Sequence, residues 1–583
     1  MKFLRNLLAV LLGLFIFTFI AFFLLIGVVS ISSTDQTVTI SKNTMLHLVI
    51  SGNIVEREIE DPFSDIGILG SGSRLIGLKE IKEAIRQAKT DDAINGIFLE
   101  PKIFMGGMAS IEEIRDEIKS FKESGKFVVS YSEYYTEKAY YLASVADEIY
   151  LTPDFGFLEF NGMSAEYMFF KGTLDKLGVE PQIFRVGDYK GAVEPFIRTD
   201  LSKENREQIG SYVNSIYDHV LSKIAFERDM TIDELRKISN SMLVREGEDA
   251  VTHGLIDGIM YYDQVKQVLR EKMGLEADDD IRAVSYKKYN RSYSNSKYSK
   301  ERIAVIVAEG NIYSGKGENG VIGSDTYAKL IRNARENDRV KAVVIRMNSG
   351  GGSALASDII WKEIKLTTEK KPVVASVADV AASGGYYIVM ACDKIIAHPT
   401  SITGSIGIFG ILFNLEGLLE NKLGITTDNV STGEYSNLFT VSRPLTAFEK
   451  DIIQKNVEKG YETFTTKAAD DRNMEIDELL KIASGRVWSG AEAKELGLLD
   501  EFGSLEDAIT SAAEMADISD YSVSYYPIQK TLLEQVMSDL GADVHAKMLK
   551  LKTGNLYPYI EKVEELTKYN GIQARMPFDI EIN

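Results

Sequence analysis

Apolar residues recur along this chain in two ways, as short continuous runs and as runs with helical spacing. The continuous runs predict buried strands, and the spaced runs predict amphipathic helices that cover them. In the first half of the chain the pattern predicts strands at 45–50, 96–99, 127–131 and 148–151 and helices at 78–88, 111–123 and 137–145. Because strands and helices alternate, we expect an α/β fold of parallel sheets with crossover helices.

The same order of elements returns in the second half. It predicts helices at 327–337, 354–366 and 385–390 and strands at 340–346, 372–377 and 394–397. Residue i aligns with residue i+246 without a gap from about 81 to 195, so that Tyr140 falls on Tyr386 and Leu177 on Leu423. Each copy is far longer than the repeat of a solenoid, so the pattern predicts a duplicated domain.

The N-terminus carries a different pattern. Lys2 and Arg5 precede residues 7–29, an uncharged run of 23 residues rich in Leu, Phe and Ile. A helix of about 20 residues crosses the hydrocarbon core of a bilayer, so this run predicts a transmembrane anchor, with signal-peptide cleavage near 30–33 as the alternative. The positive charges on the short flank predict a cytoplasmic N-terminus and a single-pass topology with the remaining chain outside.

Charge and cysteine content narrow the class of protein. The net charge is −20 and acidic residues are spread along the chain, which argues against a nucleic-acid partner. Cys392 is the one cysteine, so no internal disulfide framework is possible. It follows an apolar run, which favours a buried and inert thiol.

The two copies differ at positions where chemistry is expected. Lys190 aligns with Ser436, and Ser405, inside a Gly-Ser-Ile-Gly turn, aligns with Glu159. Alone, a serine between glycines is more often a turn residue, and a lysine is more often a solvated surface charge. A lysine kept in one copy and a serine kept in the other instead predict one composite site built from both halves.

A glycine-rich loop, residues 348–353, lies between a predicted strand and a predicted helix of the second copy. Three consecutive glycines allow backbone N–H groups to converge at the start of that helix, where negative charge is favoured. A tetrahedral oxyanion would suit this place. The alternatives are a tight turn or a phosphate loop, but the Walker pattern needs a Lys-Ser/Thr pair that is absent here.

A serine nucleophile needs a base, and two residues are candidates. His398 lies seven residues before Ser405, without an obvious carboxylate to orient it. Lys190 is the other candidate. A lysine acts as a general base only when desolvation or a neighbouring positive charge lowers its pKa from about 10.4 towards neutrality.

Three segments carry a resemblance to a known family. Residues 184–196, 382–387 and 403–410 resemble the lysine segment, a further signature and the nucleophile segment of the long form of signal peptide peptidase A (protease IV), a family of membrane-anchored bacterial serine proteases. The resemblance implies Ser405 as nucleophile and Lys190 as general base. It also implies a tandem duplication of a Clp-protease/crotonase-like domain, with repeated β-β-α units, and a dome-shaped homo-tetramer on the outer face of the bacterial inner membrane.

Two details of the site follow from the same resemblance. The oxyanion is expected to accept from the backbone N–H of Gly351 or Gly352 and from that of Ile406. The loop departs from the family at Gly350, where a proline is usual, so its backbone is less restricted. The family places a hydroxyl beside the lysine, and Thr426 or Thr427 falls near the expected position.

The sequence thus predicts a membrane-anchored Ser-Lys endopeptidase that acts outside the cytoplasm on peptides, released signal peptides among them. No cofactor or metal is expected, since no His/Cys/carboxylate cluster has ligand spacing. The alternatives are a catalytically decayed scaffold or binding protein of the same fold and a crotonase-type acyl-CoA enzyme. The expected parts are a cytoplasmic N-terminus at 1–6, an anchor at 7–29, a linker at 30–44, a first domain with the lysine at 45–284, a linker at 285–302, a second domain with the serine at 303–515 and an extension at 516–583.

Overall fold

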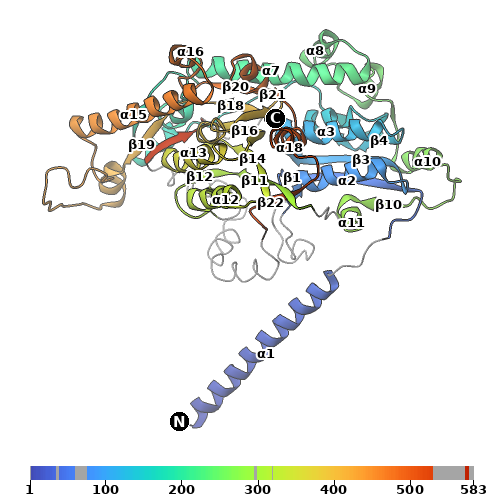
Figure 1. Cartoon of the computed structure of the whole chain (residues 1–583), viewed down its shortest axis with the longest axis horizontal. Coiled ribbons are helices and arrows are strands. Elements are labelled where there is room, and N and C mark those ends of the chain that lie inside the picture. Colours follow the sequence, from blue (N-terminus) through green and yellow to red (C-terminus); the bar gives the residue numbers. More distant parts are fainter. Residues whose placement is uncertain are drawn as a thin grey trace.

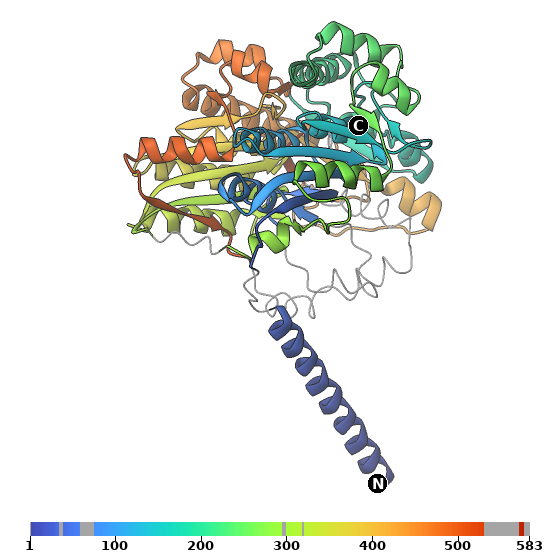
Figure 2. The same cartoon turned by 90° about the vertical axis from the view of Figure 1, so that its right-hand side faces the viewer.

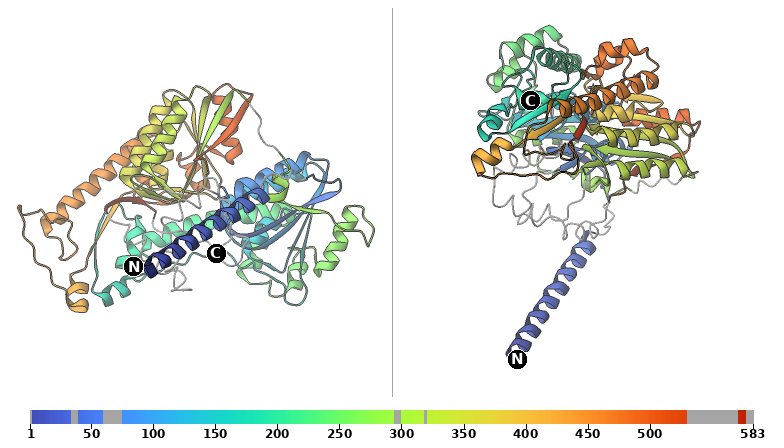
Figure 3. Two further views of the ribbon diagram at one scale, coloured as in Figure 1. Left: turned by 90° about the horizontal axis from the view of Figure 1, so that it is seen from below. Right: turned by 90° about the vertical axis from the view of Figure 1, so that its left-hand side faces the viewer.

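The computed structural model describes residues 2–33, 39–58, 75–293, 299–317, 320–529 and 571–576, without the side chains of residues 4 and 21–33. Two sheet-containing halves lie side by side in it (Figures 1 and 3). Most of the expected extension at 516–583 lies outside the described residues.

Helix α1 (Lys2–Ser33) projects away from the two halves (Figures 1 and 2). Within the part of the chain that the structure describes, no helix combines the length and the apolar character needed to cross a membrane. The anchor at 7–29 therefore stays a prediction.

The first half is built on a sheet whose paired strands are all parallel, as the alternation of elements predicts. Its order is β10-β1-β3-β4-β6-β9, with β2 beside β1. The strands are β1 (Thr44–Val55), β2 (Leu75–Gly77), β3 (Ile94–Met105), β4 (Phe127–Ser132), β6 (Glu148–Leu151), β9 (Gly258–Ile259) and β10 (Ala283–Ser285); β5 (Tyr134–Tyr135) and β7 (Phe157–Leu158) form a separate pair.

Helices of the first half follow the predicted apolar spacing. In α2 (Leu78–Thr90) the residues Leu78, Ile81, Ile85 and Ala88 lie on one buried face. The remaining helices are α3 (Met108–Lys122), α4 (Glu137–Ala143), α5 (Lys171–Leu177), α6 (Glu194–Ile197), α7 (Lys203–Arg228), α8 (Ile232–Asn240), α9 (Gly247–Thr252), α10 (Tyr262–Lys272) and α11 (Tyr286–Asn290), with a 3₁₀ turn at Gly191–Val193.

The second half repeats these elements, which confirms the predicted duplication. Its main sheet has the order β20-β18-β16-β14-β11-β22. The strands are β11 (Glu301–Glu309), β14 (Val340–Ser349), β16 (Val373–Ala382), β17 (Lys394–Ala397), β18 (Ile402–Gly404), β20 (Val487–Ser489), β21 (Glu501–Phe502) and β22 (Tyr521–Tyr526). The helices are α12 (Ser324–Glu336), α13 (Ala354–Thr368), α14 (Gly384–Val389), α15 (Ala447–Asp471), α16 (Ile476–Ile482), α17 (Gly490–Glu495) and α18 (Leu505–Met515), with a π turn at Leu418–Leu423.

Two boundaries differ in detail from the sequence expectation. Strand β11 begins at Glu301, inside the expected linker, and α11 also lies there. Strand β22 falls inside the expected extension after residue 515, yet it pairs in parallel with β11. The sheet of the second half therefore continues past the point where the internal repeat fades.

A third sheet joins the halves and positions the functional site. Its order is β13-β12-β15-β23-β19-β8, where β12 is Asn311–Tyr313, β13 is Val321–Gly323, β15 is Gly351–Ser353, β19 is Phe409–Asn414 and β23 is Gly571–Arg575. Strand β8 (Glu180–Arg185) belongs to the first half and pairs antiparallel with β19 of the second, from Arg185 opposite Phe409 to Glu180 opposite Asn414. This pairing brings the chain that follows β8 to the start of β19.

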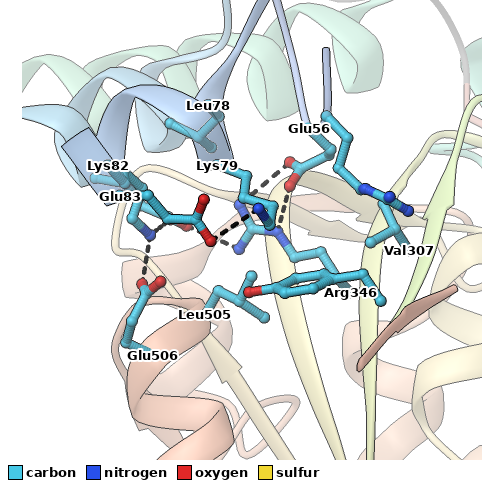
Figure 4. A pocket seen from close by; sticks show the side chains of 12 residues that line it. Glu56, Leu78, Lys79, Lys82, Glu83, Val307, Arg346, Leu505 and Glu506 are labelled. Atoms are coloured by element: carbon cyan, nitrogen blue, oxygen red, sulfur yellow. Dashed lines mark hydrogen bonds and ion pairs between the residues drawn. The ribbon is translucent and has the colours of Figure 1, made fainter. Parts of the chain in front are cut away.

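Buried charges also hold the halves together (Figure 4). Arg346 of the second half is fully buried and forms ion pairs with Glu56 at 2.8 Å and with Glu113 at 2.8 Å, both from the first half. Lys82 pairs with Glu113 and, at 2.5 Å, with Glu506. The cavity among them measures about 10 Å³, room for about one water. Removing one member would leave a buried charge unpaired, which costs about 3–5 kcal/mol.

Candidate active site

Ser405 lies in a sharp turn between β18 and β19. Gly404 has φ +79° and Ser405 has φ +51°, a left-handed conformation that a residue with a Cβ seldom adopts. The amide of Ser405 donates to the carbonyl oxygen of Arg486 at 2.6 Å, and the residue is fully buried. The surrounding structure thus imposes a strained backbone on this serine, a feature that clusters at functional sites.

Lys190 reaches Ser405 from the other half of the molecule. Its Nζ lies 3.0 Å from Ser405 Oγ, 3.0 Å from the Ser405 carbonyl oxygen and 2.8 Å from Ser383 Oγ. The lysine is fully buried. The structure therefore brings together the two residues that the sequence predicts as nucleophile and base.

The surroundings of Lys190 favour its neutral form. Burial alone holds the pKa of Lys190 well below its usual value of 10.5. Desolvation penalises the ammonium and leaves the amine unaffected, so the pKa falls when no carboxylate compensates. A neutral amine has a lone pair that can accept the hydroxyl proton of Ser405, which is what a general base requires.

The lysine is held by the chain just beyond α16. The amides of Asp188 and Tyr189 donate to the side chain and carbonyl of Ser484 at 3.1 and 3.2 Å. A Cβ on Gly485 would lie 2.7 Å from Lys190 Cβ, so only a glycine fits against the lysine there. These contacts fix the side chain in a narrow slot between the halves.

The hydroxyl that contacts the lysine is Ser383. This residue has φ +53° and immediately precedes α14. Thr426 and Thr427, which the resemblance suggests for this position, are exposed to solvent. The structure thus places a different hydroxyl on Lys190. Ser383 lies in the segment 382–387, which the resemblance singles out without assigning it a role.

Ser383→Ala is expected to lower kcat roughly tenfold to a hundredfold. The hydroxyl orients the amine of Lys190, and a lost hydrogen bond to a reacting group costs about 1–3 kcal/mol. A positioning role predicts that the apparent pKa of the pH–rate profile also moves, whereas a purely structural role would change thermal stability and leave that pKa in place. Ser383→Thr, which keeps the hydroxyl, should recover part of the rate. Full activity of Ser383→Ala would refute the assignment.

The glycine loop forms β15, which lies in the same sheet as β19, the strand that follows the nucleophile turn. Gly351 has φ +102°, and its amide donates to Ser349 Oγ at 3.1 Å, while Gly352 pairs with Ile312. The amide of Ile406 donates to no residue that the structure describes. Gly351, Gly352 and Ile406 are all buried. Their role as oxyanion donors remains a prediction: the Gly351 amide has Ser349 Oγ as an acceptor, and Gly352 lies in the strand ladder between Ile312 and Ala574.

Strand β23 shows what the groove beside these residues accepts. It pairs antiparallel on one side with β15, where Ala574 lies opposite Gly352, and on the other with β19, where Gln573 lies opposite Phe409. The amide of Met576 donates to the Gly350 carbonyl at 2.6 Å. An extended chain thus fits between the glycine loop and the strand that follows the nucleophile.

The other candidates lie away from Ser405. Ser436 is exposed, and its hydroxyl donates to the Gly433 carbonyl at 2.8 Å. His398 is buried against two carboxylates, with Nδ1 at 3.8 Å from Glu112 and Nε2 at 3.6 Å from Glu113. These charges raise the pKa of His398 despite its burial. Among the described residues, Lys190 is the base in contact with the serine hydroxyl.

The same region holds a cluster that spacing along the chain does not reveal. Ligand atoms of Glu112, Asp116 and His398 lie within 4.8 Å of one another. Glu112 accepts hydrogen bonds from His219 at 2.6 Å and from Thr400 at 2.9 Å. These bonds give each carboxylate oxygen a donor and link residues of the two halves in one hydrogen-bond network.

Comparison with known proteins shows the family to which the chain belongs. Residues 120–276 and 365–519 each match Peptidase family S49, one match in each half. Protease 4 of Salmonella typhi is 35% identical over 553 residues, which cover 91% of this chain and 88% of that protein. The chloroplastic serine protease SPPA of Arabidopsis thaliana is 36% identical over 513 residues, covering 86% of this chain and 74% of that protein. A solved structure of a ClpP1 mutant from Listeria monocytogenes aligns with 35% of this chain and 94% of its own at 18% identity and a TM-score of 0.24, too low to support an argument.

Proposed function

The chain belongs to peptidase family S49 and is a serine peptidase, and from this premise we propose that Ser405 and Lys190 are its catalytic dyad. The observation that carries the proposal is the 3.0 Å contact between Lys190 Nζ and Ser405 Oγ inside a fully buried site. The low pKa of Lys190 and the strained turn at Ser405 support the same roles.

The reaction follows from these positions. Lys190 takes the proton of Ser405 as Oγ attacks the peptide carbonyl carbon. Backbone N–H groups of Gly351 or Gly352, with that of Ile406, stabilise the resulting oxyanion. The lysine ammonium then protonates the leaving amine and an acyl-enzyme forms. Lys190, neutral again, activates the water that hydrolyses this ester, and the serine is restored.

We propose extended, apolar peptides as substrates, released signal peptides among them. The position of β23 supports an extended substrate, because the groove between β15 and β19 pairs with a strand along both of its edges. The apolar character comes from the resemblance to signal peptide peptidases. Each half is assigned to the Clp-protease/crotonase fold on the same resemblance and on its parallel, helix-connected sheet.

Labelling with a fluorophosphonate tests the dyad against its rivals. We expect one labelled residue per chain, Ser405, because Glu159 and Ser436 occupy the register positions of a second nucleophile and a second base. A decayed scaffold would take no label, and an acyl-CoA enzyme of the crotonase class would not depend on Ser405. Peptide mass spectrometry of the labelled chain gives the position. Two labels per chain, or a label on Ser436, would contradict the composite site.

We further propose that the chain is anchored in the bacterial inner membrane by residues 7–29 and that both halves lie on its outer side. The uncharged run after Lys2 and Arg5 supports this topology, as does the direction in which α1 leaves the two halves (Figure 2). Release of the chain from membranes by alkaline carbonate would contradict an integral anchor.

We also propose a homo-tetramer, and the internal repeat suggests how copies would join. Strand β8 pairs with β19 within the chain, yet the register counterparts of these strands, 426–431 and 163–168, form no strand. Val430 is 99% exposed there. The same antiparallel contact made between 426–431 of one chain and 163–168 of the next would close a ring. A solubilised chain that sediments as a monomer at micromolar concentration would contradict it.

A further inference from the structure

The first half contains a cavity of about 590 Å³ at the place that corresponds to the active site of the second half. By the offset of 246 residues, its Glu159 stands at the position of Ser405, Glu137 at that of Ser383 and Gly106 at that of Gly352. Asp379, Val380, Thr400 and Ile402 of the second half complete its wall. The cavity is therefore the first half's version of the peptide groove.

In the second half the peptide groove holds β23, which lies between β15 and β19. The register counterparts of the pairing residues are 105–107 and 163–165, and four of these six, Met105, Gly106, Gly107 and Ser164, line the cavity. The same backbone edges thus flank a space into which an extended peptide fits.

The floor of the cavity is acidic. Glu137 is 6% exposed, and its Oε2 accepts from the amides of Asn161 at 3.2 Å and Gly162 at 2.8 Å. Its Oε1 is buried without a hydrogen-bond partner among the described residues. The hydroxyl of Tyr217 donates to Ser239 at 2.8 Å, and it also lies close enough to Glu137 to lower the pKa of that carboxyl. Burial raises the pKa of Glu137 to about 7, and the charge of Glu159 adds to the effect. An unpartnered carboxylate oxygen in such a place favours a ligand with N–H donors.

The rim of the cavity is apolar. Ile103 is 71% exposed and Met105 is 53% exposed at the end of β3, although both are large apolar side chains. The other charged groups of the wall have partners: Lys138 donates to the Gly106 carbonyl at 3.3 Å, and Asp379 accepts from the amide and hydroxyl of Ser110. Glu159 accepts from the hydroxyl of Tyr134 at 3.1 Å. With three carboxylates, Glu137, Glu159 and Asp379, against one lysine, Lys138, the lining carries a net negative charge.

We propose that this cavity binds, without cleaving, an apolar peptide segment that carries an amino or guanidinium group. The apolar rim and the strand-shaped groove fit the segment, and the two carboxylates fit the cation. Cleavage does not follow, because Glu159 replaces the nucleophile. The ligand class rests on the proposed function as a peptidase, since the same peptides would reach both grooves. The chain would thus hold one end of a substrate at the first half while the second half cuts elsewhere.

Equilibrium binding tests the proposal on the full chain with Ser405→Ala, so that no turnover occurs. The probe is a dansylated Leu/Ala octapeptide with one lysine, read by fluorescence anisotropy, and its matched control is the same peptide with acetyl-lysine. We expect the lysine peptide to bind at least tenfold more tightly than the acetylated one. Adding Glu137→Gln and Glu159→Gln should remove that difference, whereas Glu133→Gln, an exposed acid outside the cavity, should leave it unchanged.

Equal affinity for the two peptides, or a preference that survives in the double variant, would overturn the proposal. Ser164→Trp gives a second route, because Ser164 is exposed at the cavity and a tryptophan would fill it. It should weaken binding of the lysine peptide at least tenfold. Unchanged binding together with dissociation of the oligomer would assign the cavity to a neighbouring chain instead. Because binding is read without hydrolysis, this result is independent of the dyad.

Discussion

Replacing Ser405 or Lys190 with alanine is expected to abolish peptide hydrolysis, and the double variant should be no less active than either single one. In the proposed dyad both residues take part in one proton transfer across a contact of 3.0 Å, so loss of either one stops that step. Residues that act as such a unit show strongly non-additive losses, of about four to six orders of magnitude in kcat for catalytic groups of this kind. Steady-state hydrolysis of a fluorogenic peptide measures the effect.

Ser436→Ala is the matched control for these variants. It removes the hydroxyl at the register counterpart of Lys190, in an exposed loop, and should leave the rate unchanged. Circular dichroism should be the same for all four proteins. Substantial activity in Lys190→Ala would contradict the dyad and return attention to His398, although the structure places that histidine against Glu112 and Glu113.

Much of the fold follows from the sequence because its signals are local or repeated. Apolar spacing places α2 and its counterpart α12 within a few residues of their bounds. The fixed offset between the copies also singles out Lys190 and Ser405 as candidates, because each copy has only one of these two residues. Neither inference needs knowledge of which segments touch in space.

The parts that the sequence does not predict depend on long-range contacts. Ser383 contacts Lys190 across 193 positions, and the resemblance marks its segment without giving Ser383 a role beside the lysine. Strand β23 is five residues long, and it forms because β15 and β19, which are distant in the sequence, pair with its two edges. Glu112, Asp116 and His398 come from different halves, so their spacing along the chain hides the cluster. Secondary-structure propensity alone predicts such elements poorly, because their formation depends on tertiary contacts.

Activity is expected to rise with pH through the depressed pKa of Lys190 and to be retained above it. The neutral amine is the active base, and its fraction grows as pH increases past that pKa, which burial holds well below 10.5. Lys190→Arg should be as inactive as Lys190→Ala, since a guanidinium stays protonated at every working pH. The pH dependence of kcat/KM and the rate of the arginine variant measure these effects. Near-normal hydrolysis by Lys190→Arg would show that the lysine supplies only a positive charge.

The same pKa makes a prediction about stability. Between the low pKa of Lys190 in the folded chain and the value of about 10.4 in the unfolded chain, the unfolded chain binds one more proton at this residue, so folding becomes more favourable as pH rises through that window. Below the folded pKa the lysine's unfavourable contribution is present in full. Lys190→Met, which keeps the length and removes the charge, should therefore be inactive yet have a higher melting temperature at neutral pH, with a smaller rise in stability towards alkaline pH. A methionine variant that melts at a lower temperature and keeps the parent's pH dependence would mean that the buried lysine is not the group that titrates. The melting temperature and the rate together separate the effect of this residue on folding from its role as a base.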